Sequence, residues 1–100
     1  MPARTARFHE QASTEYDAAF DWYLRRSQDA ALKFDAEVSR AIGLIVDFPH
    51  RWPTGPHGTR RFLLRKFPFF LIYREPSESE VQIVAVAHTS RMPGYWMKRL

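Results

Sequence analysis

The sequence predicts an α+β domain in which a helical hairpin packs on one face of a mostly antiparallel sheet of three or four strands, in the order β-α-α-β-β-β. Two observations support this fold class. Apolar residues recur at helical spacing through the first half of the chain, and they follow strand-like patterns through the second half. The chain has 100 residues, about the size of one domain, so we expect a single domain over residues 1–100.

Two amphipathic helices are expected before residue 48 and should form an antiparallel hairpin. The first spans about Glu10 to Arg26, and the second begins at a cap, either Ser27 or Asp29, and stops before Pro49. Only two or three residues separate the helices, which favours antiparallel neighbours. The apolar stripes contain Ala12, Tyr16, Ala19, Phe20, Tyr23 and Leu24 in the first helix and Ala31, Phe34, Val38, Ala41, Ile42 and Ile45 in the second. We expect the acidic residues of both helices to form a solvated face.

Three strands are expected after the helices, preceded by a loop. Residues 49–59 hold three prolines and two glycines and should form that loop. The strands are predicted at residues 60–66, 69–74 and 81–88, with a tight connection at Phe67 and Pro68 and a polar turn at residues 75–80. The last strand, VQIVAVAH, is nearly all apolar and should lie at the centre of the sheet, buried on both faces. A short strand over residues 4–8 is expected before the first helix.

The positive charge of the chain is concentrated in its second half. The net charge is +4. Residues 1–47 carry six basic and eight acidic residues, whereas residues 48–100 carry nine basic and three acidic ones. Twelve of the fifteen basic residues are arginine, which suits bidentate recognition of phosphate or carboxylate. The distribution indicates an anionic partner, either nucleic acid or an acidic protein segment.

The tail HTSRMPGYWMKR places three functional groups after the most buried strand. It combines the imidazole of His88, the fixed charge of Arg91 and the phenol of Tyr95. Together these groups can cleave a phosphodiester without a metal, because His88 can move a proton, Arg91 can stabilise charge on phosphate and Tyr95 can stack a base. A histidine at a strand end can equally be a hydrogen-bonded structural residue, and Tyr95 and Trp96 can equally anchor the chain end on the sheet.

Four cations lie within the predicted strand over residues 60–66. Strand alternation predicts Arg61 and Arg65 on one face and Arg60 and Lys66 on the other. Arg74 of the neighbouring strand can join either pair. The functional interpretation is a groove for a nucleic-acid backbone or an acidic peptide, and the alternative is a set of edge charges that discourage aggregation.

The sequence lacks the residues that several classes of function require. There is no cysteine, so neither a disulfide framework nor a cysteine zinc site is available. His9, His50 and His57 are scattered without carboxylates at ligand spacing, and no phosphate loop or dinucleotide glycine pattern occurs, so we expect neither metal nor cofactor. No apolar run is long enough for a signal peptide or a membrane span, which predicts a cytoplasmic protein without a membrane partner.

Almost the whole chain resembles toxins of the RelE/ParE superfamily, the toxic halves of bacterial type II toxin-antitoxin modules, often called plasmid stabilisation proteins. The resemblance runs from FHEQA and EYDAAFDWYL through ALKFDAEVSRAIGLIVDFP, and its specific parts are RKFPFFLIY and VAVAHTSRMPGYW. It implies the fold predicted above, a growth inhibitor held silent by a cognate antitoxin, and a toxin-antitoxin hetero-oligomer.

The resemblance leaves two targets open. RelE-like members cut messenger RNA on the ribosome without a metal, and this mechanism would use His88 as acid or base, Arg91 and Arg65 on the transition-state charge and Tyr95 on a base or phosphate. ParE-like members instead poison DNA gyrase and lack that catalytic set. The long helical hairpin with the HxxRxPxYW tail is common among ParE-like relatives, and the middle loop lacks the dense lysines of RelE itself. Residues expected to bind nucleic acid or target are Arg60, Arg61, Lys66, Arg74, Lys98 and Arg99. The remaining alternative is a degenerate member that only binds an antitoxin.

Overall fold

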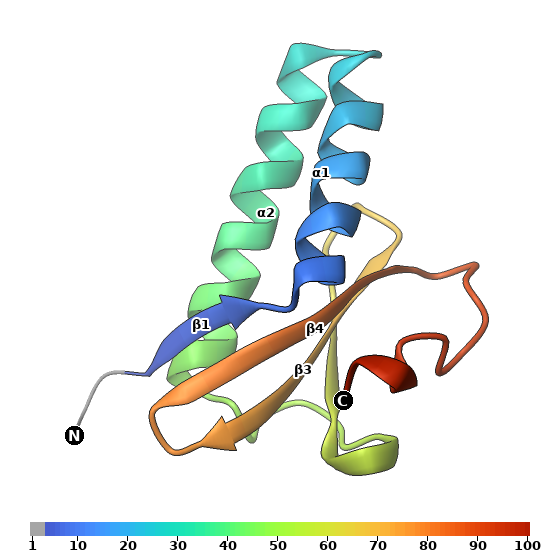
Figure 1. Ribbon diagram of the computed structural model, residues 1–100. Helices are drawn as coiled ribbons and strands as arrows, with labels where there is room; N and C mark the ends of the chain where they lie inside the picture. Colours follow the sequence, from blue (N-terminus) through green and yellow to red (C-terminus); the bar gives the residue numbers. More distant parts are fainter. Residues whose placement is uncertain (1–3) are drawn as a thin grey trace.

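The computed structural model describes residues 4–100 and has the predicted order of elements (Figure 1). They are β1 (Thr5–Phe8), α1 (Glu10–Leu24), α2 (Gln28–Asp47), β2 (Arg60–Leu63), β3 (Phe69–Ser77) and β4 (Glu80–His88). The strands form one sheet in the order β1-β4-β3-β2, with β1 parallel to β4 and the other neighbours antiparallel. The predicted α+β fold class is therefore confirmed, including the central position of β4 and the short first strand.

Side-chain caps define where the two helices begin. The His9 side chain accepts a hydrogen bond from the backbone N–H of Gln11 before α1. The Ser27 hydroxyl accepts one from the backbone N–H of Ala30, so Ser27 and not Asp29 is the cap of α2. Three residues, 25–27, separate the helices, and the two run antiparallel to each other (Figure 1).

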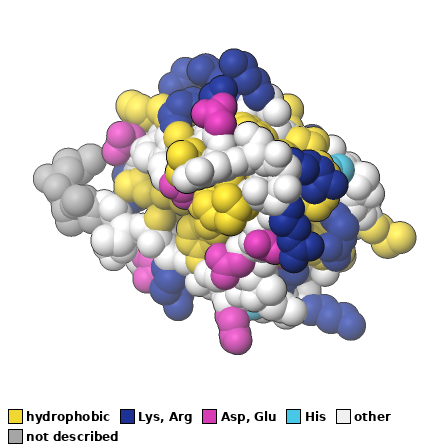
Figure 2. Space-filling model, turned by 90° about the horizontal axis from the view of Figure 1, so that it is seen from above, with side chains coloured by type: hydrophobic (Ala, Val, Ile, Leu, Met, Phe, Trp, Pro, Cys, Tyr) yellow, Lys and Arg dark blue, Asp and Glu magenta, His cyan; other side chains and the backbone are white. Residues whose placement is uncertain are grey.

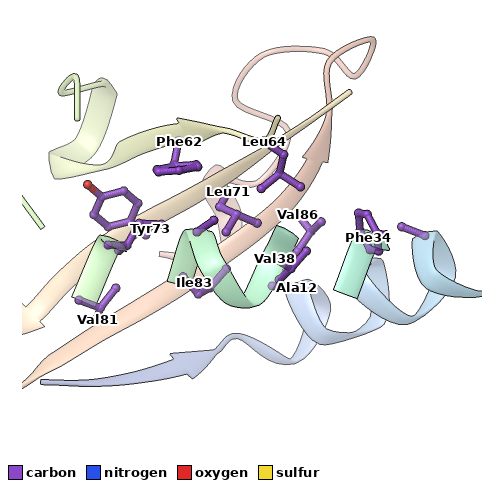
Figure 3. Close-up of a cluster of buried hydrophobic side chains, with 13 residues drawn as sticks. Ala12, Phe34, Val38, Phe62, Leu64, Leu71, Tyr73, Val81, Ile83 and Val86 are labelled. Atoms are coloured by element: carbon purple, nitrogen blue, oxygen red, sulfur yellow. The ribbon is translucent and has the colours of Figure 1, made fainter. Parts of the chain in front are cut away.

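The main hydrophobic core lies between the helical hairpin and one face of the sheet. Phe34 of α2 is fully buried and packs its ring within 5.1–5.6 Å of four other aromatic rings, measured between centroids. The sheet contributes alternate residues of β3 and β4, among them Leu71, Tyr73, Val81 and Ile83 (Figure 3). We call this side of the sheet the helix face.

The opposite side of the sheet, called the back face here, carries a second and smaller apolar cluster. It contains Ile72, Val84, Ala85, Ala87 and Trp96. A register shift between Ile72 and Tyr73 leaves Val84 as an extra residue of β4, because Ile72 pairs with Ala85 and Tyr73 with Ile83. This bulge reverses the alternation of β4. Trp96 is 5% exposed, so its interpretation as a packing residue is confirmed.

The strand predicted at residues 60–66 is shorter than expected, and its predicted alternation is wrong at the end. β2 stops at Leu63, and Lys66 adopts a left-handed backbone with φ of 65°, which a strand does not contain. The Glu37 carboxylate accepts the backbone N–H of Arg65 at 2.6 Å and also pairs with Arg40. Arg65 and Lys66 therefore lie in the β2–β3 turn and on neither strand face.

Glu37 and Asp35 were both expected to be solvated, and the structure gives each a partner. The hydrogen bond from Arg40 holds the pKa of Glu37 below its usual value, against the opposing effect of burial. The Tyr16 hydroxyl donates to Asp35 across the hairpin. These contacts join α1 to α2 and α2 to the β2–β3 turn. Asp35 is exposed, as expected, whereas Glu37 is half-buried, so the prediction of a solvated position is wrong at Glu37.

The polar turn before β4 is also shorter than predicted. β3 continues to Ser77 and β4 begins at Glu80, which leaves Glu78 and Ser79 as the connection. Pro76 lies within β3, where a second register shift between Arg74 and Ser77 interrupts the ladder. A proline is tolerated at such an irregularity because no ladder hydrogen bond is required from it.

Candidate functional site

A pocket of about 430 Å³ lies between the back face, the loop before β2 and the chain after β4. We call it the basic pocket. Its cationic and titratable lining residues are Arg60, Arg61, His88 and Arg91, and its apolar lining includes Phe70, Ile72, Ala87, Tyr95 and Trp96. Within residues 4–100, no aspartate or glutamate is among the lining residues. An anion in the pocket would therefore meet positive charge without a competing carboxylate.

Two arginines of the basic pocket rest on aromatic rings. The Arg61 guanidinium lies 5.0 Å from the ring centroid of Phe70, and the Arg91 guanidinium lies 3.9 Å from that of Tyr95. In the described part of the chain, neither guanidinium forms a salt bridge or a side-chain hydrogen bond. Stacking restricts their orientation while leaving their donors available.

His88 lies at the end of β4, where the basic pocket meets α1. Its ring packs edge-on against Phe69 with centroids 5.1 Å apart. Its Nδ1 accepts the backbone N–H of Ser90 at 3.0 Å and lies 2.7 Å from the Ser90 hydroxyl. With Nδ1 as an acceptor, the neutral ring carries its proton on Nε2, which is then a donor.

Glu15 connects α1 to β4 and to the chain after β4. Its carboxylate accepts hydrogen bonds from the Tyr95 hydroxyl at 2.6 Å, the backbone N–H of Val86 at 3.0 Å and the Arg99 guanidinium at 2.7 and 3.0 Å. The acidic residues of α1 were expected to form a solvated face, and this prediction is wrong for Glu15, which is half-buried.

A helical-spacing signal for Glu15 was present in the sequence. Glu15 stands three residues after Ala12 and four residues before Ala19, and both alanines are buried. Residues at these separations share one side of a helix. The pattern places Glu15 on the covered side of α1, although it does not name the partner.

The hydrogen bonds of Glu15 determine its charge and that of Tyr95. Burial opposes ionisation of the Glu15 carboxyl, but the hydrogen bonds from Arg99, Tyr95 and Val86 outweigh burial and hold its pKa below the usual value. Burial and the bond to Glu15 raise the pKa of Tyr95 well above its usual value. Near neutral pH, Glu15 is therefore a carboxylate and Tyr95 keeps its proton.

The same network closes a part of β4 that β1 does not reach. β1 pairs with β4 only as far as Ile83. Beyond this point the Arg99 guanidinium donates to the carbonyl of Val84 at 3.0 Å, and Val86 donates to Glu15. Backbone groups in a buried strand need partners. Glu15 and Arg99 supply them where a neighbouring strand is missing.

The sequence matches the family described as the ParE toxin of the type II toxin-antitoxin system parDE, over residues 6–93. The chain belongs to the ParE toxin family of type II toxin-antitoxin systems. No curated protein matches the sequence. A solved structure described as a chromosomal ParDE toxin-antitoxin system from P. aeruginosa resembles the chain with a TM-score of 0.74 and 20% identity, covering 88% of this chain and 98% of that one. At that identity the likeness shows the fold.

In this ParE-family toxin, the residues predicted to act together divide into two groups. His88, Arg91, Tyr95, Arg60 and Arg61 all line the basic pocket. The residues outside its lining are Arg65, Lys66, Arg74, Lys98 and Arg99. The basic second half of the chain therefore does not form one continuous site.

Several of these cations form hydrogen bonds or ion pairs within the protein. Arg60 donates to the backbone carbonyls of His50 and Trp52, which holds the loop before β2. Arg74 donates to Gln82 on the adjacent strand. The Arg99 side chain is 9% exposed and pairs with Glu15. In Figure 2, which looks down on the hairpin, Lys and Arg atoms gather at the upper edge and on the right, the side where the chain after β4 lies in Figure 1.

Two features of the described residues bear on metal binding and on membranes. Residues 4–100 contain no group of three or more His, Asp or Glu side chains arranged to hold a metal ion. Across the same residues, neither helix combines the length and the apolar character needed to cross a membrane.

Proposed function

We propose that this toxin arrests bacterial growth by binding and poisoning DNA gyrase and that it does not cut messenger RNA. The observation that carries the choice is the Tyr95 hydroxyl, which donates to the Glu15 carboxylate at 2.6 Å and has a raised pKa. Because its proton is committed to Glu15, the hydroxyl cannot donate it to a phosphate, which is the positioning role that the nuclease hypothesis gives Tyr95. A gyrase poison acts in the cytoplasm, which is the expected location of the protein.

The other groups of the nuclease hypothesis support the same choice. Arg65 lies in the β2–β3 turn, where its backbone N–H is held by Glu37, and it is not among the residues that line the basic pocket. Of the four residues in the nuclease hypothesis, only His88 and Arg91 both line the basic pocket and keep a functional group free there. A proton acceptor on the attacking hydroxyl and a proton donor to the leaving oxygen are both needed for phosphodiester cleavage. One histidine without a second positioned acid or base fits binding better than this chemistry.

A paired assay with the purified toxin tests the target. In one arm, relaxed plasmid, gyrase and ATP are incubated with toxin, and we expect loss of supercoiling at micromolar toxin with accumulation of cleaved DNA. In the other arm, programmed ribosomes are incubated with the same preparation, and we expect the messenger RNA to stay intact. Cut messenger RNA together with normal supercoiling would overturn the proposal.

Induced expression without an antitoxin separates a toxin from a degenerate member. We expect growth arrest and a loss of plasmid supercoiling in the arrested cells. Unimpeded growth with soluble toxin present would instead support a protein that serves only to bind an antitoxin.

Neutralisation by a cognate antitoxin belongs to the same proposal. A second groove of about 390 Å³ lies between α1 and the end of β4, lined by Ala18, Ala19, Trp22 and Val86 among others. Trp22 is 51% exposed. The apolar side chains of this groove suit an extended apolar segment of the antitoxin.

Co-expression with the adjacent open reading frame tests the antitoxin groove. The Ala18→Glu variant puts a charge into the groove and should abolish co-purification of the antitoxin. Ala36→Glu, on the exposed surface of α2, is the matched control and should leave it intact. Equal co-purification by both variants would remove the groove from the interface.

A further inference from the structure

We propose that the basic pocket binds an unpaired nucleotide of a single nucleic-acid strand, with its phosphate held by Arg61 and Arg91 and its base on the apolar floor of the pocket. The binding itself stands on the geometry of the pocket. Its biological meaning, a contact between the toxin and a DNA strand opened in the gyrase complex, rests on the proposed function.

The charge of the pocket selects an anion. Arg61 comes from β2 and Arg91 from the chain after β4, and both line the same cavity. Elsewhere in the toxin, exposed cations such as Arg25 and Lys33 pair with a carboxylate one helical turn away. Arg61 and Arg91 have no such partner within the described residues, so their charge is available to a ligand.

The planar shape of the Arg61 and Arg91 guanidiniums favours phosphate as the bound anion. A guanidinium presents a planar fork of donors that matches two oxygens of a phosphate group. Stacking on Phe70 and Tyr95 restricts the motion of the two side chains before a ligand arrives. Less side-chain freedom is then lost on binding. His88 lines the same pocket, and because its Nδ1 accepts from Ser90, Nε2 is the ring nitrogen left to donate.

The floor and size of the pocket favour a base beside the phosphate. Phe70, Ile72, Ala87 and Trp96 provide an apolar surface next to the cations. The volume of about 430 Å³ falls in the range of about 300–1,000 Å³ found for small-molecule sites. Bases stack on aromatic rings and on arginine planes without regard to sequence.

The pocket also predicts a preference for single strands. In a duplex, each base is paired and stacked inside the helix, so only phosphates reach the rim of the cavity. An unpaired base can leave the strand and enter the pocket. We therefore expect weak binding to duplex of the same sequence and no strong sequence preference.

Fluorescence anisotropy with the whole toxin tests the proposal without gyrase. The probes are a labelled DNA strand of about 12 nucleotides, its duplex, an RNA strand of the same sequence and a labelled acidic peptide containing leucines. We expect the single strands to bind about tenfold tighter than the duplex or the peptide. A preference for DNA over RNA would fit the gyrase complex. A preference for RNA would keep the pocket proposal and count against the gyrase target.

Two substitutions and a matched control connect binding to the pocket. Arg61→Ala and Arg91→Ala should each weaken single-strand binding about tenfold. Each should also lower the slope of log K against log salt by about 0.7. Arg26→Ala is the control, because Arg26 also stacks on a ring, that of Trp22 at 3.4 Å, but belongs to the connection between α1 and α2 and does not line the basic pocket. The affinity of Arg26→Ala for the single strand should change less than about twofold. Thermal melting checks that all three variants are folded.

Three results would overturn the proposal. The first is no single-strand binding by the wild-type toxin at low salt. The second is equal affinity for the strand and its duplex, since the base would then not enter the pocket. The third is tight binding of the acidic peptide, lost in both pocket variants, without binding of the strand. Because none of these measurements contains gyrase, failure of the gyrase assay would remain a separate result.

Discussion

The helix face and the back face of the sheet are held together in different ways. On the helix face, whole aromatic rings from both helices pack on β3, β4 and the β2–β3 turn around Phe34. On the back face the apolar cluster is small, and Trp96 with the Glu15 network attaches the chain end to it. The back face also leaves two guanidiniums free of carboxylates. We infer that the helix face supplies most of the stability, and we propose the back face as the binding surface.

The largest expected effect is the loss of the ring at the centre of the helix face. Phe34→Ala should lower the free energy of unfolding by about 3–5 kcal/mol, because a fully buried aromatic side chain is replaced by a cavity. Urea denaturation followed by circular dichroism measures it. A loss below about 1 kcal/mol would mean that the helix face does not dominate the stability.

An intermediate loss of stability is expected when the Glu15 network, which attaches the chain end to α1 and β4, is broken. Glu15→Ala should cost about 2 kcal/mol near neutral pH, because Arg99 and the N–H of Val86 lose their partner. Glu10→Ala, in the first turn of the same helix and exposed, is the control and should change little.

The loss of unfolding free energy in Glu15→Ala should be larger at neutral pH than in acid. The pKa of Glu15 is lowered in the folded chain. The stabilisation is therefore present above the unfolded pKa, near 4.5, and is lost as pH falls through the lower folded value. Denaturation at neutral and at acidic pH should show the wild type and the variant converging in acid. An equal gap at both pH values would show that the charge of Glu15 contributes nothing.

The smallest stability effect is expected at the free cations of the back face. Arg91→Ala should change the free energy of unfolding by less than about 0.5 kcal/mol, because Arg91 is exposed and its contact is an exposed stack on Tyr95. The same variant should lose gyrase inhibition in the supercoiling assay. A strongly destabilised Arg91→Ala would assign the residue to structure and would weaken the contrast between the two faces.

Sequence periodicity predicted the elements well because each pattern is local. The helical stripe through Phe34 and the apolar run of β4 are properties of consecutive residues, and both were correct. The end of β2 at Leu63 was missed because the turn that follows is held by Glu37, which accepts the backbone N–H of Arg65 from 28 positions earlier in the chain. A contact across that separation leaves no periodic signal in either segment.

By itself, the sequence determined the fold class, the charge difference between the two halves and the family resemblance carried by RKFPFFLIY and VAVAHTSRMPGYW. The tertiary structure decided which charges are free. Glu15 was counted as solvated and Arg99 as a target-binding cation, yet they neutralise each other across 84 positions of sequence. Arg61 and Arg91 are brought to one pocket while Arg65 is excluded from it. The sequence gives the charge of each side chain. Which charged side chains form ion pairs depends on strand register, on the bulge of β4 and on the path of the chain end, and only the folded chain establishes these.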